Sequence, residues 1–312
     1  MTTLNEKKEG ERVVGFFIIK DRVLKVAANG SEYLDFVLVD RKTTITAKLW
    51  DITAQQKEIL QKKAVVKVEG IVHFYRNQKQ LNIQRIRLAV EDDPVKLVDL
   101  IPHANVSREE LWHDLRLFID EIESPQLAQI IKRLFGDKNV RDLVTTIPAG
   151  KKLHHAYYAG LLEHIVTLCH GAVQLLSLYP FVNKDHVLAT CMLHDIGKIK
   201  ELSDPIAPEY TTEGELMGHI ILGIEMINDA ARELGFASDD PDIAAVKHCI
   251  LSHHGDVDWG WGSAVSGKTP AAVFFHYLDQ IDAKMNAMQA VNESGADEWN
   301  YSPMLKRRIY KG

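Results

Sequence analysis

The chain has 312 residues, enough for two domains that each bury a core, and its 46% hydrophobic and 26% charged residues are typical of a soluble globular protein. The formal net charge of -6 excludes a protein that is basic over its whole surface, although a local basic face can still bind phosphate. We expect no membrane span, because no apolar run approaches the roughly 20 residues required. We expect no signal peptide, because residues 1–11 form a polar tail of mixed charge. Three widely spaced cysteines in apolar surroundings indicate reduced thiols and a cytoplasmic protein.

Residues 12–92 have the sequence pattern of a small β-barrel. Apolar and polar residues alternate over Ile45–Leu49 and along much of Val65–Tyr75. The latter segment is expected to pair with Gln80–Leu88 as a hairpin, with a β-bulge where the pattern changes phase near Gln84. About five short strands in a segment of this length predict a closed barrel, and the oligonucleotide-binding (OB) fold is the commonest such architecture.

One face of this barrel is a candidate for binding single-stranded nucleic acid. It combines aromatic rings, which stack on bases, with cations, which neutralise phosphates. The candidates are Lys48, Trp50, Tyr75, Arg76, Lys79 and Arg85. Small barrels also carry exposed lysine and arginine routinely, and Trp50 could cap the core. The sequence therefore leaves nucleic-acid binding and a plain solvated face both open.

Helical patterns replace the β-pattern after an acidic, turn-forming stretch that ends at Pro94, and residues 93–148 are predicted to be a helical connector. Ser107 and Glu110 have the spacing of a capping box, which predicts a helix start at Ser107. A second helix is expected to follow Ser124-Pro125 and to end at Gly136. We find no residues in this connector that indicate chemistry.

An all-α domain is expected over residues 149–290, and its distinctive stretch is Cys191–Lys198. There an apolar helix ends in two adjacent side chains of the metal-ligand type, His194 and Asp195. Burying them is costly unless a partner compensates for their desolvation, and a metal ion is the usual partner. Lys198 could add a positive charge for a substrate phosphate, with a surface lysine as the alternative.

Five further residues of this type lie beside apolar or glycine neighbours on other helical segments. They are His164, His219, His253, His254 and Asp279. In the last segment an apolar stripe is formed by Phe274, Leu278, Ile281, Met285 and Met288. Asp279 and Asp282 share the adjoining face, so either could be the ligand. A single histidine on an apolar helix is more often a core residue, but seven ligand-type residues together indicate a metal site.

Five histidines and two carboxylates are too many for one tetrahedral zinc ion. They suit two ions about 3.5–4 Å apart, bridged by a carboxylate and a hydroxide. Because the set has no cysteine, manganese, magnesium, iron or cobalt fits better than a soft metal. Two such ions hydrolyse phosphate esters by in-line attack, which predicts a phosphodiesterase or phosphomonoesterase.

The order of these ligands, H…HD…H…HH…D, resembles the HD-domain superfamily of metal-dependent phosphohydrolases. The wider chain resembles the YhaM-type 3′-to-5′ exoribonucleases, which join an N-terminal OB fold to an HD domain. The resembling stretches are Ile45–Asp51, His154–Tyr157, Leu161–His164, Leu193–Lys198, Gly218–Ile220, Ser252–Gly255 and His276–Asn286.

This resemblance implies removal of nucleotides from the 3′ end of single-stranded RNA, or also of single-stranded DNA, with release of nucleoside monophosphates. It also implies two divalent ions, manganese first. One ion would be held by His164, His194 and Asp279, and the other by His219, His253 and His254, with Asp195 as the bridge. The family pattern prefers Asp279 to Asp282. His154 and His155 would touch the scissile phosphate or have a structural role where the helix begins.

Two departures from the family pattern bear on substrate preference. Ala271-Ala272 stands where an acidic residue is expected, and the loop Asp256–Thr269 has its own Trp-Gly-Trp-Gly sequence. We expect both to lie near the mouth of the substrate site.

Residues 291–312 are expected to be a C-terminal tail. Its basic run Lys306-Arg307-Arg308 is interpreted as solvated, with RNA binding as the alternative. Two other functions compete with the exonuclease. One is an HD phosphohydrolase acting on a small nucleotide, and the other is a nucleic-acid-binding protein with a structural HD domain. A homo-oligomer is compatible with the sequence, and no membrane partner is expected.

Overall fold

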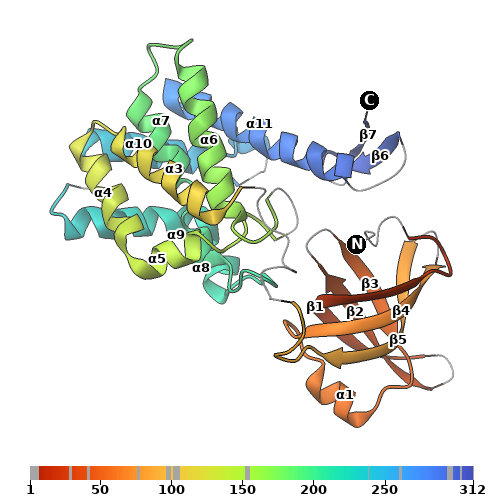
Figure 1. Ribbon diagram of the computed structural model, residues 1–312. Helices are drawn as coiled ribbons and strands as arrows, with labels where there is room; N and C mark the ends of the chain where they lie inside the picture. The colour runs from red at the N-terminus through yellow and green to blue at the C-terminus, as the bar shows by residue number, and fades with distance from the viewer. Residues whose placement is uncertain are drawn as a thin grey trace. The chain divides into compact units, whose positions relative to one another are not determined.

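The computed structural model describes residues 7–27, 30–40, 43–75, 78–95, 100, 106–151, 155–237, 239–259, 262–293, 298–302 and 304–311. The chain divides into two compact units, residues 1–103 and residues 104–312 (Figure 1). No helix within the described residues has the length and apolar character needed to cross a membrane.

The first unit is a closed five-stranded barrel, as predicted. Its elements are β1 (Arg12–Val26), β2 (Glu32–Val39), β3 (Thr44–Leu49), α1 (Ala54–Ile59), β4 (Val65–Tyr75) and β5 (Gln78–Leu88). The strand order around the barrel is β1-β2-β3-β5-β4, in which β3 and β5 are parallel and the other pairs are antiparallel. The predicted alternation is confirmed on β3, where Ile45, Ala47 and Leu49 are buried and the residues between them are not.

The predicted β-bulge is present in β5. Glu69 pairs with Arg85 and Gly70 pairs with Ile83, so Gln84 is the extra residue on the longer side. A Cβ atom on Gly70 would lie 2.6 Å from the carbonyl oxygen of Asn82, so glycine lets the two strands close tightly at the bulge.

The second unit is mainly helical. Its helices are α3 (Arg108–Asp120), α4 (Pro125–Gly136), α5 (Lys138–Val144), α6 (Gly160–Leu176), α7 (Lys184–Leu193), α8 (Lys198–Glu201), α9 (Thr212–Glu233), α10 (Pro241–Ser252), the 3-10 turn η2 (Val257–Trp259) and α11 (Pro270–Glu293). The predicted helix starts are confirmed, because Ser107 and Glu110 form a capping box and α4 begins at Pro125.

The connector helices share one hydrophobic core with the predicted all-α domain. Leu115 of α3 and Ile130 of α4 belong to the same buried cluster as Leu162 of α6 and Val187 of α7. The connector and the all-α domain therefore form a single folding unit rather than two.

The C-terminal segment contains a two-stranded sheet where the sequence analysis describes a tail. β6 (Trp299–Ser302) and β7 (Arg307–Tyr310) pair antiparallel. In Figure 1, α11 extends beyond the other helices, and the two strands lie beside its C-terminal end.

The buried face of α11 differs from the predicted apolar stripe. Leu278 of that stripe is buried, but Ile281 and Met285 are 54% and 58% exposed. Phe275 and Asp279 point into the core instead. The face of α11 that packs against the core is therefore the one that carries Asp279, rather than the predicted apolar stripe.

Asp242, at the start of α10, joins three helices. Its Oδ2 accepts a hydrogen bond from Ser124 Oγ at 2.5 Å, and its Oδ1 lies 2.9 Å from Nε2 of His186 on α7. The hydrogen bond with His186, followed by that with Ser124, lowers the pKa of Asp242. A carboxylate with a lowered folded-state pKa stabilises the fold above its unfolded-state pKa of about 4. That stabilisation is lost as the pH falls through the lower folded-state pKa.

We therefore expect Asp242→Asn to be less stable than the wild type at pH 7, and the difference to shrink as the pH falls below about 4. Urea unfolding at several pH values measures both quantities. Asp239→Asn, at an exposed neighbouring position, is the matched control and should show no such trend. A stability difference that stays constant down to about pH 2.5 would contradict the assignment.

Candidate metal centre and nucleic-acid-binding face

The predicted metal ligands converge in the interior of the second unit. His164 lies on α6, His194 and Asp195 at the end of α7, His219 on α9, His253 and His254 at the end of α10, and Asp279 on α11. His219 and His254 are partly exposed and the other five are buried. The structure thus brings together all the residues that the sequence analysis selected as ligands.

His164, His194 and Asp279 form what we call the first triad, whose ligand-type atoms all lie within 4.8 Å of one another. His164 Nε2 is 3.1 Å from His194 Nε2 and 3.3 Å from Asp279 Oδ1. Two imidazole nitrogens that face each other need a proton or a cation between them. Burial disfavours a charged His164, but hydrogen bonds to Asp279 and Asp282 outweigh it and raise the pKa of His164 to about 10. The first triad therefore attracts positive charge.

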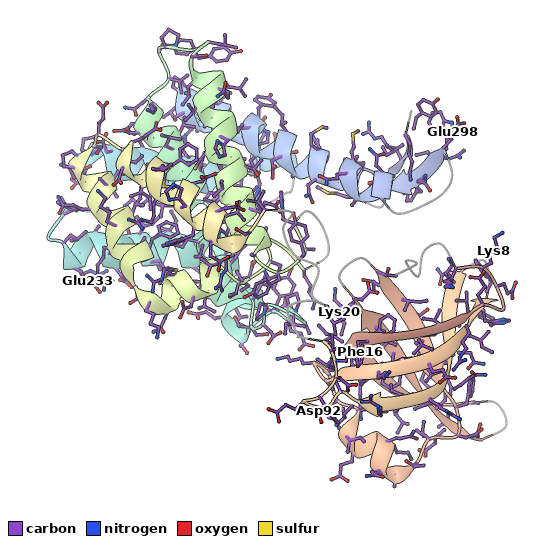
Figure 2. The ribbon with its side chains drawn as sticks, in the orientation of Figure 1. Lys8, Phe16, Lys20, Asp92, Glu233 and Glu298 are labelled. Carbon is purple, nitrogen blue, oxygen red and sulfur yellow. The ribbon has the colours of Figure 1, made fainter. Side chains whose placement is uncertain are left out.

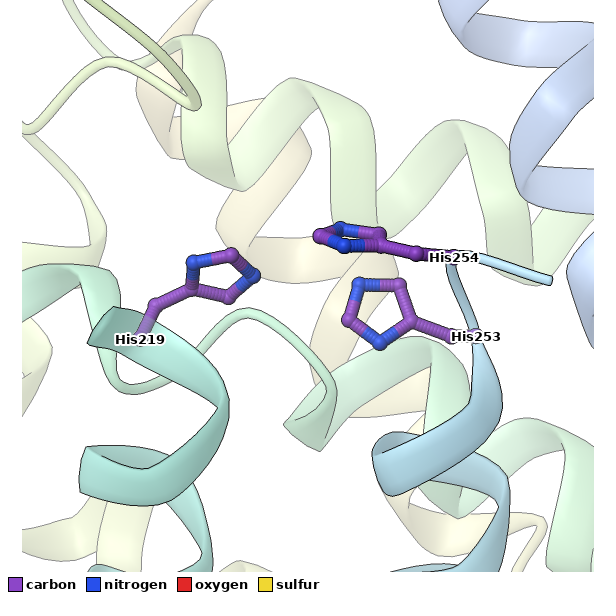
Figure 3. Close-up of side chains that lie close together, drawn as sticks. All are labelled: His219, His253 and His254. Atoms are coloured by element: carbon purple, nitrogen blue, oxygen red, sulfur yellow. The ribbon is translucent and has the colours of Figure 1, made fainter. Parts of the chain in front are cut away.

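His219, His253 and His254 form the second triad, again with ligand-type atoms within 4.8 Å of one another. Figure 3 shows the three rings gathered between the elements that carry them. His219 Nε2 is buried and has no hydrogen-bond partner among the described residues. Burial, followed by the charges of His254 and His194, lowers the pKa of His253 well below its ordinary value. Neutral rings with an unused nitrogen are the form that binds a metal.

Asp195 lies between the two triads. Its Oδ2 is 3.5 Å from His194 Nε2 and 3.9 Å from His164 Nε2, whereas its Oδ1 is 3.3 Å from His219 Nε2. Lys198 Nζ lies 3.7 Å from the same Oδ1, and only 11% of the lysine side chain is exposed. One carboxylate oxygen faces each triad, and Lys198 belongs to the centre rather than to the solvated surface.

Backbone carbonyls orient two of the histidines. His194 Nδ1 lies 3.2 Å from the carbonyl oxygen of Thr190, and His253 Nδ1 lies 2.7 Å from that of Ile250. Because a carbonyl can only accept, each Nδ1 carries the proton and donates, which leaves Nε2 with a free lone pair.

Carboxylates orient two other histidines. Asp282 Oδ2 lies 2.7 Å from His164 Nδ1, and Glu201 Oε1 lies 3.2 Å from His219 Nδ1. Glu201 also accepts a hydrogen bond from the backbone N–H of His219, which the positive φ of 71° at Gly218 makes available by interrupting α9. Asp282 therefore contacts the Nδ1 side of the His164 ring, whereas His194 and Asp279 lie on its Nε2 side.

His155 supports this arrangement from the interior. It is 4% exposed, and its Nε2 lies 2.9 Å from Asp282 Oδ2. Its Nδ1 lies 2.7 Å from the hydroxyl of Tyr157, which in turn donates to Glu163. Together with His164 and Asp282, His155 also satisfies the spacing of a third metal-ligand group. Its protein partners favour the structural role over contact with a phosphate, and His154 lies outside the described residues.

Close packing against α9 explains why a glycine, Gly197, follows His194 and Asp195 in the sequence His-Asp-x-Gly-Lys. A Cβ atom at this position would lie 2.0 Å from the carbonyl oxygen of His219 and 2.6 Å from the backbone nitrogen of Gly223. Glycine therefore allows α9 to approach closely enough to bring His219 beside Asp195.

The two departures from the family pattern have different positions. Ala271 and Ala272 are buried in the core at the start of α11, and their position near the mouth of the substrate site stays a prediction. In the loop Asp256–Thr269, residues 260–261 lie outside the described residues.

Part of the predicted face on the barrel forms a compact cluster. Lys48 Nζ lies 5.4 Å from the ring centre of Tyr33, 5.9 Å from that of Trp50 and 5.7 Å from that of Tyr75. Tyr33 and Trp50 stack at 4.4 Å with an interplanar angle of 30°. We call these four residues the barrel cluster. Tyr33 is not among the residues predicted from the sequence, because only the pairing of β2 with β3 brings it beside Trp50.

The other predicted residues of the barrel lie elsewhere or are not described. Lys79 Nζ lies over the ring of Phe74 at 5.8 Å. Arg85 lines a separate hollow of about 510 Å³ together with Lys67 and Val14. Arg76 lies outside the described residues. The barrel cluster, rather than the full predicted set, is thus the coherent aromatic and cationic surface.

Comparisons with known proteins agree with both units. The family model of the OB-fold nucleic acid binding domain matches residues 16–89, and that of the HD domain matches residues 161–284. The chain is 36% identical over 309 residues to a protein of Geobacillus sp. (strain WCH70), covering 97% of this chain and 92% of that one. It is 36% identical over 287 residues to a protein of Bacillus subtilis (strain 168) and 34% identical over 287 residues to one of Bacillus pumilus (strain SAFR-032), covering 91% of this chain and 88% of each. All three are named 3'-5' exoribonuclease YhaM. At this identity over nearly the whole chain, the resemblance is confirmed, and the chain belongs to the YhaM family.

Proposed function

We propose that this protein is a metal-dependent 3′-to-5′ exoribonuclease that hydrolyses phosphodiester bonds and releases nucleoside monophosphates. Membership of the YhaM family supports the reaction. The main structural support is the arrangement of seven ligand-type residues as two triads with the Asp195 carboxylate between them.

In this proposal each triad would hold one divalent ion, and Asp195 would be a ligand shared by the two sites. When bound, such a pair of ions supplies an activated hydroxide and neutralises charge on the attacking and leaving oxygens. The donor set fits, because His219 Nε2 is buried without a hydrogen-bond partner among the described residues and the Nδ1 atoms of four ligand histidines are engaged on their far sides. Lys198 would hold a positive charge beside the phosphate that is cleaved.

Manganese is the ion that we propose, with magnesium, iron and cobalt as alternatives. Oxygen and imidazole ligands without thiolate suit these ions. Metal-stripped protein reconstituted with each ion in turn tests the choice.

Asp279 is proposed as the ligand and Asp282 as the residue that positions His164. Removing a hydrogen-bond partner of a ligand histidine typically weakens metal binding about 10- to 100-fold. We therefore expect Asp282→Ala to raise the Mn²⁺ concentration for half-maximal activity by about that factor, while kcat at saturating metal falls less. Lys284→Ala, at an exposed position of the same helix, is the control. An unchanged metal dependence of Asp282→Ala would refute the positioning role.

The barrel cluster is proposed to bind the RNA strand upstream of the cleaved end. Its rings offer stacking surfaces, and Lys48 adds a positive charge among them. Single-stranded DNA offers the same bases and phosphates, so we propose it as a second, weaker substrate.

Trp50→Ala is expected to raise KM for a 20-nucleotide RNA about 5- to 150-fold, because stacking contributes about 1–3 kcal/mol per base. Hydrolysis of a dinucleotide should be unaffected. Ile59→Ala, which removes an exposed side chain on α1, is the matched control. Equal losses on both substrates would argue against a role in binding the strand.

The proposed function is tested by incubating the protein with Mn²⁺ and a 5′-labelled single-stranded RNA. We expect a ladder that shortens from the 3′ end, is abolished by a chelator and is absent with the variant H194A/D195A. Intact RNA with metal demonstrably bound would overturn the exonuclease and favour hydrolysis of a small nucleotide.

The three cysteines are buried free thiols, which supports a cytoplasmic location.

A further inference from the structure

The C-terminal hairpin, β6 with β7, has two different faces. Trp299 pairs with Tyr310, and Tyr301 pairs with Arg308. Because side chains alternate along a strand, these four residues share one face. On the opposite face Ser302 is 1% exposed and Ile309 8% exposed, and β6 packs against α11.

The outward face consists of aromatic rings and one guanidinium group. Trp299, Tyr301 and Tyr310 are 48%, 60% and 53% exposed. The rings of Trp299 and Tyr310 lie 5.0 Å apart at 38°, and the Arg308 guanidinium lies 5.7 Å from the ring of Trp299. The inner face anchors this sheet to α11, and the outer face exposes three large rings. Such a face can stack on a ligand that has flat rings of its own.

The charge of this segment selects the ligand. Between residues 298 and 311 the sequence has four basic residues, Lys306, Arg307, Arg308 and Lys311, and one acidic residue, Glu298, a net charge of +3 in a chain of -6. Figure 2 labels Glu298, which precedes the first strand rather than lying on the outward face. Of these charges, that of Arg308 lies on the outward face, and aromatic rings beside a cation match a strand of stacked bases with a phosphate backbone. An apolar protein surface would gain nothing from the charge of Arg308.

We propose that this outward face is a second binding surface for single-stranded RNA, on the same folding unit as the metal centre. Bases stack on Trp299 and Tyr301, and Arg308 pairs with a phosphate. The inference rests on the proposed function, because it gives the exonuclease a strand contact outside the barrel. A second contact on one strand raises the affinity for long RNA through effective concentration, without any new chemistry.

The test compares the full-length wild type with W299A/Y301A. Affinity for a fluorescent 20-nucleotide RNA is measured by anisotropy in the presence of a chelator, so that the RNA stays intact. We expect the double variant to bind about 10-fold more weakly or worse. Metal-dependent hydrolysis of bis(p-nitrophenyl) phosphate, which is too small to reach the hairpin, should be unchanged.

Two further variants separate stacking from folding of the hairpin. W299F/Y301F retains the rings and should bind RNA like the wild type. Arg308→Gln should reduce the salt dependence of binding by about one phosphate contact. Y179A/F181A removes two rings that are 45% and 73% exposed elsewhere on the same unit, and it should have no effect.

Wild-type RNA affinity in W299A/Y301A would overturn the proposal, and so would a loss of self-association in sedimentation without a loss of RNA affinity. These results differ from failure of the proposed function itself. In that case the wild type would neither bind nor shorten RNA.

Discussion

Asp195→Asn is expected to lower kcat for RNA hydrolysis by about 10³-fold or more. Two-metal-ion catalysis lowers the activation free energy by several kcal/mol, and each 1.36 kcal/mol is a factor of ten in rate. Asp195 is the residue whose two oxygens face the two triads, and it is 3% exposed. The amide keeps the shape but removes the negative charge that would lie between two cations. Initial rates on 5′-labelled RNA, together with metal content per protein, measure the effect.

Asp229→Asn is the matched control for this experiment. Asp229 lies on α9 in an exposed pair with Arg232, so its loss should change neither rate nor metal content. An Asp195→Asn enzyme that retains both ions and a rate within tenfold of the wild type would contradict the bridging role.

Gly197→Ala is expected to destabilise the second unit by about 3 kcal/mol, at the upper end of the usual cost of overpacking. The added Cβ would meet the backbone of α9 at His219 and Gly223. Backbone atoms on a packed helix cannot move aside as the end of a flexible side chain can. Urea unfolding followed by circular dichroism measures the loss, and the β-barrel transition serves as an internal reference.

Gly136→Ala is the contrasting substitution. No atom of the described residues lies within 4 Å of the Cβ that it adds at the end of α4, and Gly136 does not have a positive φ. It should leave stability unchanged or raise it by up to about 1 kcal/mol. Equal unfolding midpoints for Gly197→Ala and the wild type would show that α9 can shift without cost.

The sequence predicted the barrel and the helix starts well because both follow from short-range patterns. The alternation along β3 and the phase change at Gln84 are local signals, and so is the capping box at Ser107. The ligand-type residues could also be selected from the sequence, because seven of them lie beside apolar or glycine neighbours on helical segments.

The choice between Asp279 and Asp282 could not be made from helical periodicity. Both lie on the same side of α11, three residues apart. Their environments differ because His155, 127 residues away in sequence, lies beside Asp282 and not beside Asp279. Glu201 was missed for the same reason, since only the packing of α8 against α9 brings it to His219.

The C-terminal strands were missed because each has only four residues, too few for a clear alternation. Trp299 and Tyr301 read as isolated aromatic residues until pairing with β7 places them on one face. The tail interpretation therefore failed where a long-range contact with α11 supplies the missing stability.

His194 and His253 are the C-terminal caps of α7 and α10. Aligned peptide dipoles place roughly half a negative charge at the C-terminal end of a helix. Two such ends meet at the centre, so the peptide backbone itself contributes a negative potential there. Because a dipole does not titrate, this contribution persists at any pH at which the helices are folded. It favours cations of higher charge and offsets part of the repulsion that two divalent ions would exert on each other.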